Sequence, residues 1–233
     1  YGSPGTGKTE IAKIMGKIFS HLGVLRNSTF KKVTRSDLIA GYLGQTAIKT
    51  RDVIAESLGG CLLIDEAYSL GNSDKKDTFS KECIDTLCEA LSHYKHDLMV
   101  IIAGYEKELN DCFFAYNKGL DSRFTWRFKT EDYKGDELFR IFCKKVKDIG
   151  WSLEENVPPI SETAKGFGKY AQKSEDSIHS AWFEKNVSYF AFFGRDMETL
   201  LSKVKIAHSR RVFCKDISEK TKDKVRAAYK LQT

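Results

Sequence analysis

Apolar and polar residues follow two different periods along the first half of the chain. Residues 9–22, 47–58 and 79–94 have apolar positions three or four apart, the spacing of an amphipathic helix. Between them, residues 29–34 favour a short strand, and residues 61–64 and 98–103 are continuously apolar. Continuous apolar runs are typical of parallel strands that are covered on both faces. The alternation predicts an α/β fold with a parallel sheet.

The second half of the chain has a different pattern. Composition changes after Phe128, and from about residue 132 onward we find helical spacing without a convincing strand, at residues 137–149, 161–172, 196–212 and 218–229. We therefore expect two domains, an α/β domain over residues 1–131 and a small all-helical domain over residues 132–233.

Charge and hydropathy narrow the class of protein. The 233 residues carry a formal net charge of +6, but basic residues are interleaved with acidic ones, which favours a solvated surface over a nucleic-acid interface. Hydrophobic residues make up 41% of the chain, enough for a folded core. No apolar run approaches the roughly 20 residues that cross a bilayer, so we expect no membrane span.

The cysteines point to a reducing environment. None of the six forms a C-x-x-C pair, and most lie within apolar or helical patterns, so we expect reduced core residues of an intracellular, most simply cytoplasmic, protein. Cys88, His93 and His96 could approach a metal together, but no second ligand pair accompanies them. We expect no zinc site there.

The strongest motif in the chain lies at its start. Residues 2–9 match G-x-x-x-x-G-K-[ST] and open a predicted helix, as a phosphate-binding loop requires. Such a loop wraps phosphates with backbone N–H groups, and the helix presents its partly positive N-terminus to the same anion. The expected ATP-binding residues are Gly2, Ser3, Pro4, Gly5, Thr6, Gly7, Lys8 and Thr9. Because a strand normally precedes this loop, we expect the first strand of the domain to lie outside this sequence.

Two acids follow the apolar run 61–64. Asp65 ends a predicted parallel strand, where it could share Mg²⁺ with the Thr9 hydroxyl, while Lys8 reaches the β and γ phosphates. Glu66 remains free to accept a proton from the attacking water. The alternative is that both carboxylates only cap the following helix. The order of loop and acids favours ATP hydrolysis.

Further segments carry a family resemblance. The phosphate loop, residues 61–66 and residues 119–124 (Gly-Leu-Asp-Ser-Arg-Phe) resemble an AAA+ ATPase in order and spacing. Residues 41–46 (Gly-Tyr-Leu-Gly-Gln-Thr), 64–70 (Ile-Asp-Glu-Ala-Tyr-Ser-Leu) and 102–105 (Ile-Ala-Gly-Tyr) are similar to the CbbX/SpoVK branch, which includes red-type rubisco activases and a sporulation protein. The resemblance is dense to about residue 130 and thinner beyond.

The resemblance implies a ring, usually a hexamer, with ATP at subunit boundaries. Arg123 then occupies the position of the arginine that the neighbour contributes, with Arg127 as the other candidate. Tyr42 matches the aromatic residue of the pore loop that grips a substrate polypeptide. Arg195, before a predicted helix, resembles the second sensor arginine of a helical lid. Asp121 stands where a basic residue is common.

The position of the first sensor is not matched. Many relatives have Asn after the fourth strand, whereas this chain reads Ala103, Gly104, Tyr105 and Glu106, so we leave that role unassigned.

These observations lead to a hypothesis of a ring-forming ATPase that remodels a protein partner whose identity the sequence does not give. Two alternatives stay open. One is an ATP-dependent scaffold that assembles without threading a substrate. The other is a nucleic-acid motor or loader, which predicts salt-sensitive stimulation by DNA or RNA.

Overall fold

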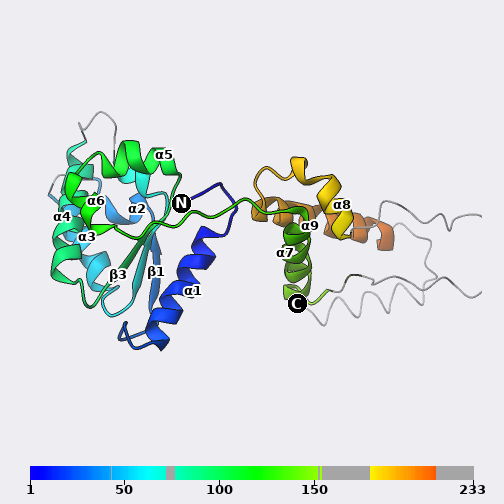
Figure 1. The fold of residues 1–233 in the computed structure, drawn as a ribbon, viewed down its shortest axis with the longest axis horizontal. Helices are drawn as coiled ribbons and strands as arrows, with labels where there is room; N and C mark the ends of the chain where they lie inside the picture. The colour runs from blue at the N-terminus through cyan, green and yellow to red at the C-terminus, as the bar shows by residue number, and fades with distance from the viewer. Residues whose placement is uncertain (43, 72–76, 152, 154–178, 214–233) are drawn as a thin grey trace, which may run out of the picture. The chain divides into compact units, whose positions relative to one another are not determined.

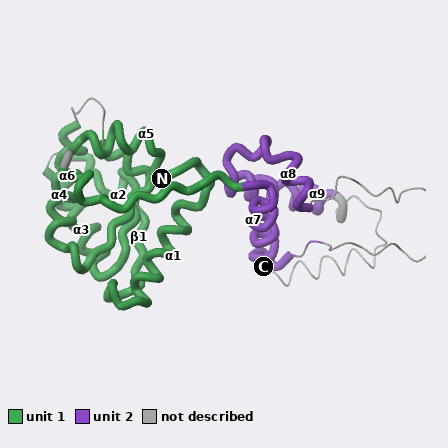
Figure 2. Tube along the Cα trace, in the orientation of Figure 1, with its two compact units in different colours: residues 1–133 green, residues 134–233 purple. Residues whose placement is uncertain are grey.

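The computed structural model describes residues 1–42, 44–71, 77–151, 153 and 179–213. These residues belong to two compact units, Tyr1–Tyr133 and Lys134–Thr233, which Figure 2 colours separately. The helices expected at 161–172 and 218–229 lie outside the described residues.

A parallel sheet forms the centre of the first unit. Its strands β1 (Phe30–Val33), β2 (Cys61–Ile64) and β3 (Met99–Ile102) lie in sequence order, and β2 pairs with both neighbours. All four residues of β2 are buried, because helices cover both faces of the sheet. The α/β fold with a parallel sheet is therefore confirmed, and the three predicted strands are present within one residue of the expected bounds.

Helices pack on the two faces of the sheet (Figure 1). Helix α1 (Lys8–His21) covers one face, where Ala12 packs with Leu63. Helices α3 (Thr46–Ala55) and α4 (Thr78–His93) pack together on the other face, over Leu62 and Ile64. Alternate residues of β2 thus enter opposite core clusters, as the period of a strand requires.

The apolar positions that predict helix α1 are not its buried ones. Ile11, Ile14, Ile18 and Leu22 are 45–70% exposed, whereas Ala12 and Gly16 are buried. Gly16 faces β2 so closely that a Cβ atom there would lie 3.0 Å from Cys61 Cβ. Small residues therefore bring α1 onto the sheet, and several of its larger apolar side chains stay largely exposed.

Short elements complete the first unit. None of them is among the helices that the sequence pattern predicts. The elements are α2 (Arg35–Leu38), the 3₁₀ helix η1 (Ala67–Leu70), α5 (Glu106–Glu108), the π-helical turn η2 (Leu109–Phe114) and α6 (Lys118–Arg123). Each is too short to show a hydrophobic period, so the pattern does not reveal them.

The described part of the second unit is helical. It contains α7 (Gly135–Asp148), α8 (Ser180–Lys185), the 3₁₀ turn η3 (Val187–Tyr189) and α9 (Gly194–Phe213). Phe142 of α7 contacts Phe183 of α8, and Leu138 of α7 and Met197 of α9 are fully buried beside these packed helices. The helices expected at 137–149 and 196–212 are confirmed, and α8 was not predicted.

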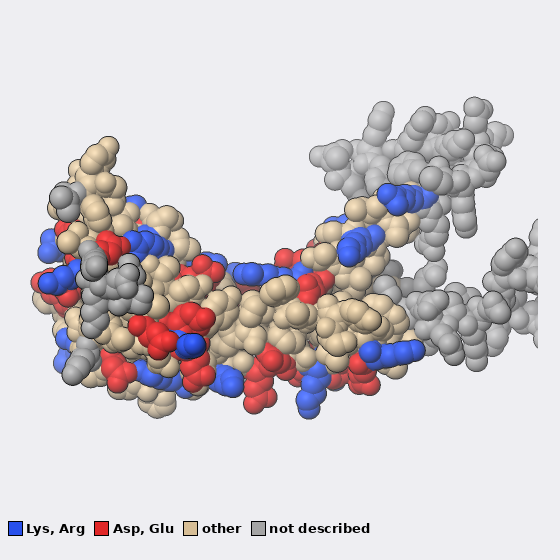
Figure 3. Space-filling model, turned by 90° about the horizontal axis from the view of Figure 1, so that it is seen from above, with Lys and Arg blue, Asp and Glu red and all other residues tan. Residues whose placement is uncertain are grey.

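The surface carries both signs of charge. Figure 3 shows Lys and Arg intermixed with Asp and Glu on the visible face. Among the described residues, no helix combines the length and apolarity that crossing a membrane requires, and no group of three or more potential metal ligands from His, Cys, Asp and Glu occurs.

Candidate nucleotide site

The loop at residues 2–7 has the backbone of an anion-binding cradle. Gly2, Gly5 and Gly7 have positive φ angles of 155°, 80° and 82°, and Gly7 is the N-cap of α1. Such conformations turn successive N–H groups toward one concave side. Side chains are strained at positive φ, so the glycines of the motif are required by the shape of this loop.

Residues far along the chain hold the loop in this shape. The buried Thr6 hydroxyl donates to the Ser3 carbonyl at 2.7 Å and lies 2.8 Å from Thr130 Oγ1. The Tyr133 hydroxyl donates to the Thr6 carbonyl at 3.0 Å. Sequence reasoning missed Thr130 and Tyr133, since no local motif marks residues about 120 positions away.

Lys8 folds back onto its own loop. Its ammonium group donates to the carbonyl oxygens of Gly2 and Ser3, both at 2.8 Å, and lies 5.4 Å from the centre of the Tyr105 ring. Carbonyls and an aromatic face both stabilise a cation. The side chain therefore remains at the concave side of the loop, where phosphate oxygens would replace the carbonyls as its acceptors.

Asp65 and Glu66 follow β2 at the carboxyl edge of the sheet. Asp65 pairs with Lys32 Nζ at 2.7 Å and also accepts the Glu66 N–H at 3.1 Å. Glu66 has a left-handed backbone with φ 53°, and its side chain makes no capping hydrogen bond to η1. A non-glycine residue in this conformation costs of order 1–3 kcal/mol, and such residues gather at functional sites.

The residues present fit Mg-ATP. Thr9 and Asp65 offer a hydroxyl and a carboxylate, the hard oxygen donors that Mg²⁺ prefers. The loop offers N–H groups, and Lys8 offers a cation for the triphosphate. Lys32, which sequence reasoning also missed, balances the charge of Asp65 in this structure.

The end of β3 connects the loop to the acids. The Gly2 N–H donates to the Gly104 carbonyl at 3.3 Å, and the Ala67 N–H donates to the Ala103 carbonyl at 3.0 Å. Directly after Gly104, the Tyr105 ring stacks on Tyr68 with 5.7 Å between centres. Residues 103–105, to which no sensor role was assigned from the sequence, thus contact both the phosphate loop and the turn after Asp65 and Glu66.

Tyr42 lies on an exposed loop between α2 and α3. Its side chain is 74% exposed, and both ends of the loop are anchored. The Ala40 N–H donates to Thr46 Oγ1 at 3.2 Å, and Lys49 donates to the carbonyls of Ser36 and Ile39 at 2.6 and 3.0 Å. The anchors fix the base of the loop while the tyrosine faces outward.

Arg123 and Arg127 differ in their partners. Arg123, on α6, donates to the Gly119 carbonyl at 2.8 Å and to Ser92 Oγ at 2.8 and 3.1 Å, all uncharged acceptors. Arg127 forms an ion pair with Asp121, and its guanidinium lies 4.3 Å from the centre of the Phe114 ring. Asp121, which departs from the family pattern, therefore has a partner within its own chain.

Arg195 belongs to the second unit. It follows Gly194 at the start of α9, where Asp196 accepts the Phe192 N–H at 2.7 Å. Phe193, just before the helix, has a left-handed backbone with φ 43°. The turn into α9 is thus tightly defined, and Arg195 leaves from its first turn.

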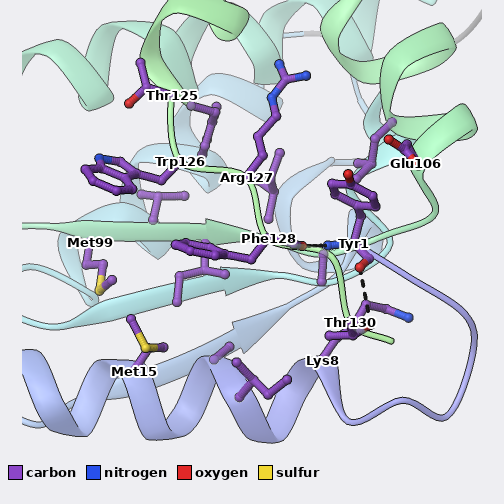
Figure 4. A pocket seen from close by; sticks show the side chains of 18 of the residues that line it. Tyr1, Lys8, Met15, Met99, Glu106, Thr125, Trp126, Arg127, Phe128 and Thr130 are labelled. Atoms are coloured by element: carbon purple, nitrogen blue, oxygen red, sulfur yellow. Dashed lines mark hydrogen bonds between the residues drawn. The ribbon is translucent and has the colours of Figure 1, made fainter. Parts of the chain in front are cut away.

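An apolar cavity of about 720 Å³ lies beside β3 (Figure 4). Its lining includes Met15 of α1, Met99 of β3 and the stacked pair Trp126 and Phe128, with Lys8 also among the lining residues. The groups that a triphosphate requires lie in the loop, so this cavity is a separate feature that shares Lys8 with the phosphate site.

Comparisons with known proteins agree with this geometry. The profile of the ATPase family associated with various cellular activities (AAA) matches residues 1–125. A cfxQ-like protein of Acanthamoeba polyphaga mimivirus is 40% identical over 217 residues, 93% of this chain and 49% of the relative. Stage V sporulation protein K of Bacillus subtilis is 42% identical over 154 residues, 66% of this chain and 47% of the relative.

Protein CbbX of Cereibacter sphaeroides is 37% identical over 163 residues, which cover 70% of this chain and 51% of that protein. The chain therefore spans about half the length of each of these relatives.

Proposed function

The chain belongs to the AAA family of ATPases, in the branch of CbbX and stage V sporulation protein K, and from this premise we propose that it binds Mg-ATP and hydrolyses it. The observation that supports this most directly is the loop of left-handed glycines that leads into α1, joined through the end of β3 to the turn that carries Asp65 and Glu66.

The proposed division of roles follows from the chemistry of each group. The N–H groups of the loop after Gly2, with the exception of Pro4, and the Lys8 ammonium bind the phosphates, and Lys8 exchanges two carbonyl acceptors for phosphate oxygens. Thr9 and Asp65 hold Mg²⁺, which when bound neutralises charge on the phosphates. Glu66 makes no cap to η1, and its carboxylate accepts the proton of the attacking water.

Replacing Glu66 by Gln tests this proposal. The change keeps size and hydrogen bonding but removes the base, so we expect a fluorescent ATP analogue to bind within about threefold of wild type while turnover falls by roughly 10²–10⁴. Glu108→Gln, an exposed carboxylate on the nearby α5, is the matched control. Turnover by Glu66→Gln at the wild-type rate would refute the assignment.

We further propose a homo-oligomeric ring, most simply a hexamer, in which Arg123 acts on the ATP of a neighbouring subunit. The local contacts support Arg123 over Arg127. Arg123 would give up hydrogen bonds to a carbonyl and a hydroxyl, whereas Arg127 would lose an ion pair and a cation–π contact. Such an arginine can be worth roughly 10³–10⁵ in rate.

The proposed work of the ring is to remodel a protein partner. An exposed aromatic residue on a loop with a fixed base, Tyr42, is suited to gripping a polypeptide that moves past it. The helical second unit would act as a lid that brings Arg195 to the nucleotide. An ATP-dependent scaffold would bind and hydrolyse ATP in the same way but would tolerate the loss of Tyr42.

The cysteines support a proposed intracellular, cytoplasmic location. Those that the structure describes are free thiols. Burial raises the pKa of Cys61 and of Cys83 to about 11, which keeps both in the unreactive protonated form.

A further inference from the structure

Two aromatic rings lie between the phosphate loop and the turn that carries the acids. Tyr105 lies three residues after the last residue of β3 and is the N-cap of α5, and Tyr68 lies in η1, two residues after Glu66. The rings stack with an interplanar angle of 24° and 5.7 Å between centres. The Lys8 ammonium lies 5.4 Å from the centre of the Tyr105 ring. The Tyr105 ring thus contacts both Lys8 of the phosphate loop and Tyr68 of η1, the 3₁₀ helix that follows Asp65 and Glu66.

The backbone around Tyr105 places the pair with little freedom. The Gly104 carbonyl accepts from the Gly2 N–H at 3.3 Å, and the Ala103 carbonyl accepts from the Ala67 N–H at 3.0 Å. The two residues before Tyr105 therefore hold both the phosphate loop and the residue before Tyr68. A Cβ atom at Gly104 would lie 3.0 Å from Tyr68 Cδ1. The absence of a side chain at residue 104 is therefore what allows the Tyr68 ring to approach β3.

The electrostatic surroundings connect Tyr68 to the acids. Burial, and after it the negative charge of Glu66, raises the pKa of Tyr68. Tyr68 therefore stays protonated, and its ring is a neutral partner for Tyr105 next to a carboxylate. Glu66 is the N-cap of η1 and is held at φ 53°. The direction of the Glu66 carboxylate therefore depends on how firmly η1 is held in place.

We propose that Tyr105 and Tyr68 are positioning residues of the ATP site, in which the stacked rings hold Lys8 and the Glu66 turn in register. This inference rests on the proposed ATP hydrolysis and adds residues to it. The role belongs to the aromatic faces, not to the hydroxyl of Tyr105. A cation–π contact changes an equilibrium by roughly two- to fivefold, so nucleotide binding should respond weakly. Misplacing a catalytic carboxylate by about 1 Å can cost roughly a hundredfold in rate.

The test separates binding from turnover. We expect Tyr105→Leu and Tyr68→Leu each to lower kcat by roughly ten- to a hundredfold and to change the Kd of a fluorescent ATP analogue by less than about fivefold. Tyr105→Phe, which keeps the ring, should stay within about twofold of wild type. Because the rings act as a pair, the double Leu variant should be no more than about threefold slower than the slower single variant.

Controls distinguish the possible failures. Tyr189→Leu replaces a tyrosine that is 80% exposed in the second unit and should leave all values unchanged. Circular dichroism identifies any variant that does not fold, and Tyr68→Leu then carries the test in place of Tyr105→Leu. A Tyr105→Phe variant as slow as Tyr105→Leu, or Leu variants with normal kcat, would overturn the role of the rings alone. If the wild-type protein does not hydrolyse ATP, or if Glu66→Gln hydrolyses it at the wild-type rate, the proposed function and this inference are both wrong.

Discussion

Replacing Asp77 separates two contributions to the stability of helix α4. Asp77 is the N-cap of α4, and its Oδ1 accepts the N–H groups of Phe79 and Ser80 at 3.0 and 3.3 Å. Its Oδ2 accepts from Arg35 of α2 at 2.6 Å and from the Ser80 hydroxyl at 2.7 Å. Asp77→Asn keeps a capping oxygen but removes the charge, whereas Asp77→Ala removes both.

The magnitude follows from the geometry and the pKa. Burial raises the pKa of Asp77, but hydrogen bonds from Ser80 and Arg35 together outweigh burial and lower the pKa from 3.8 to about 2. That shift corresponds to at most about 2.4 kcal/mol, and because 21% of the side chain is exposed we expect about 1–1.5 kcal/mol after screening. A lost cap adds about 1 kcal/mol. We expect Asp77→Asn to cost about 1–1.5 kcal/mol and Asp77→Ala about 2–2.5 kcal/mol.

The sign of the pH dependence is fixed by the lowered pKa. The charge stabilises the folded state fully above the unfolded pKa near 4, and this stabilisation is lost as the pH falls through about 2. At pH 3 about half of it should remain, so the cost of Asp77→Asn should fall to about half its value at pH 7.

Urea unfolding followed by circular dichroism measures these costs, and hydrogen exchange of α4 locates them. Asp52→Asn, an exposed aspartate on α3, is the matched control and should change stability by less than about 0.5 kcal/mol. An Asp77→Asn variant as stable as this control at pH 7, or equally destabilised at pH 3 and pH 7, would show that the charge of Asp77 does not stabilise α4.

Three further predictions concern the site. Lys8→Ala should weaken binding of a fluorescent ATP analogue by at least about tenfold, since one charge-assisted contact is worth roughly 1.5–3 kcal/mol; unchanged affinity in a titration would contradict the proposed loop. Gly104→Ala should displace the Tyr68 ring and lower kcat by about tenfold, with the Kd little changed; steady-state kinetics at the wild-type level would show that the close approach is unimportant. Tyr42→Ala should keep ATP hydrolysis within about threefold in a phosphate-release assay but abolish remodelling, whereas Tyr42→Phe should retain both; remodelling by Tyr42→Ala would favour the scaffold.

The elements that the sequence predicted well are those whose pattern is complete within themselves. Residues 61–64 are apolar at every position because both faces of β2 are covered, and the run alone identifies a buried strand. Helix α2 has four residues and depends on Asp37, which accepts the Thr34 N–H at 2.7 Å. No period can appear in so short a segment, and Asp37 is equally suited to a turn.

The site divides in the same way. The phosphate loop and the Asp65–Glu66 pair are contiguous motifs, so spacing alone indicates their chemistry. Thr130, Tyr133 and Tyr105 reach the loop through contacts between residues about 100 or more positions apart, which spacing does not reveal. Asp121 looked like a departure from the family pattern, and only the folded chain shows its ion pair with Arg127.

If neighbouring subunits complete each ATP site, the specific rate of ATP hydrolysis must depend on protein concentration, and this rate is the measurement to make. Wild type, Arg123→Ala and Arg127→Ala are compared in one series. We expect the specific rate of wild type to rise steeply with its concentration. In Arg123→Ala this rate should fall by roughly 10³-fold or more, and in Arg127→Ala it should be largely kept. A rate that does not depend on concentration and is unaffected by Arg123→Ala would mean a self-contained ATPase and would contradict the ring.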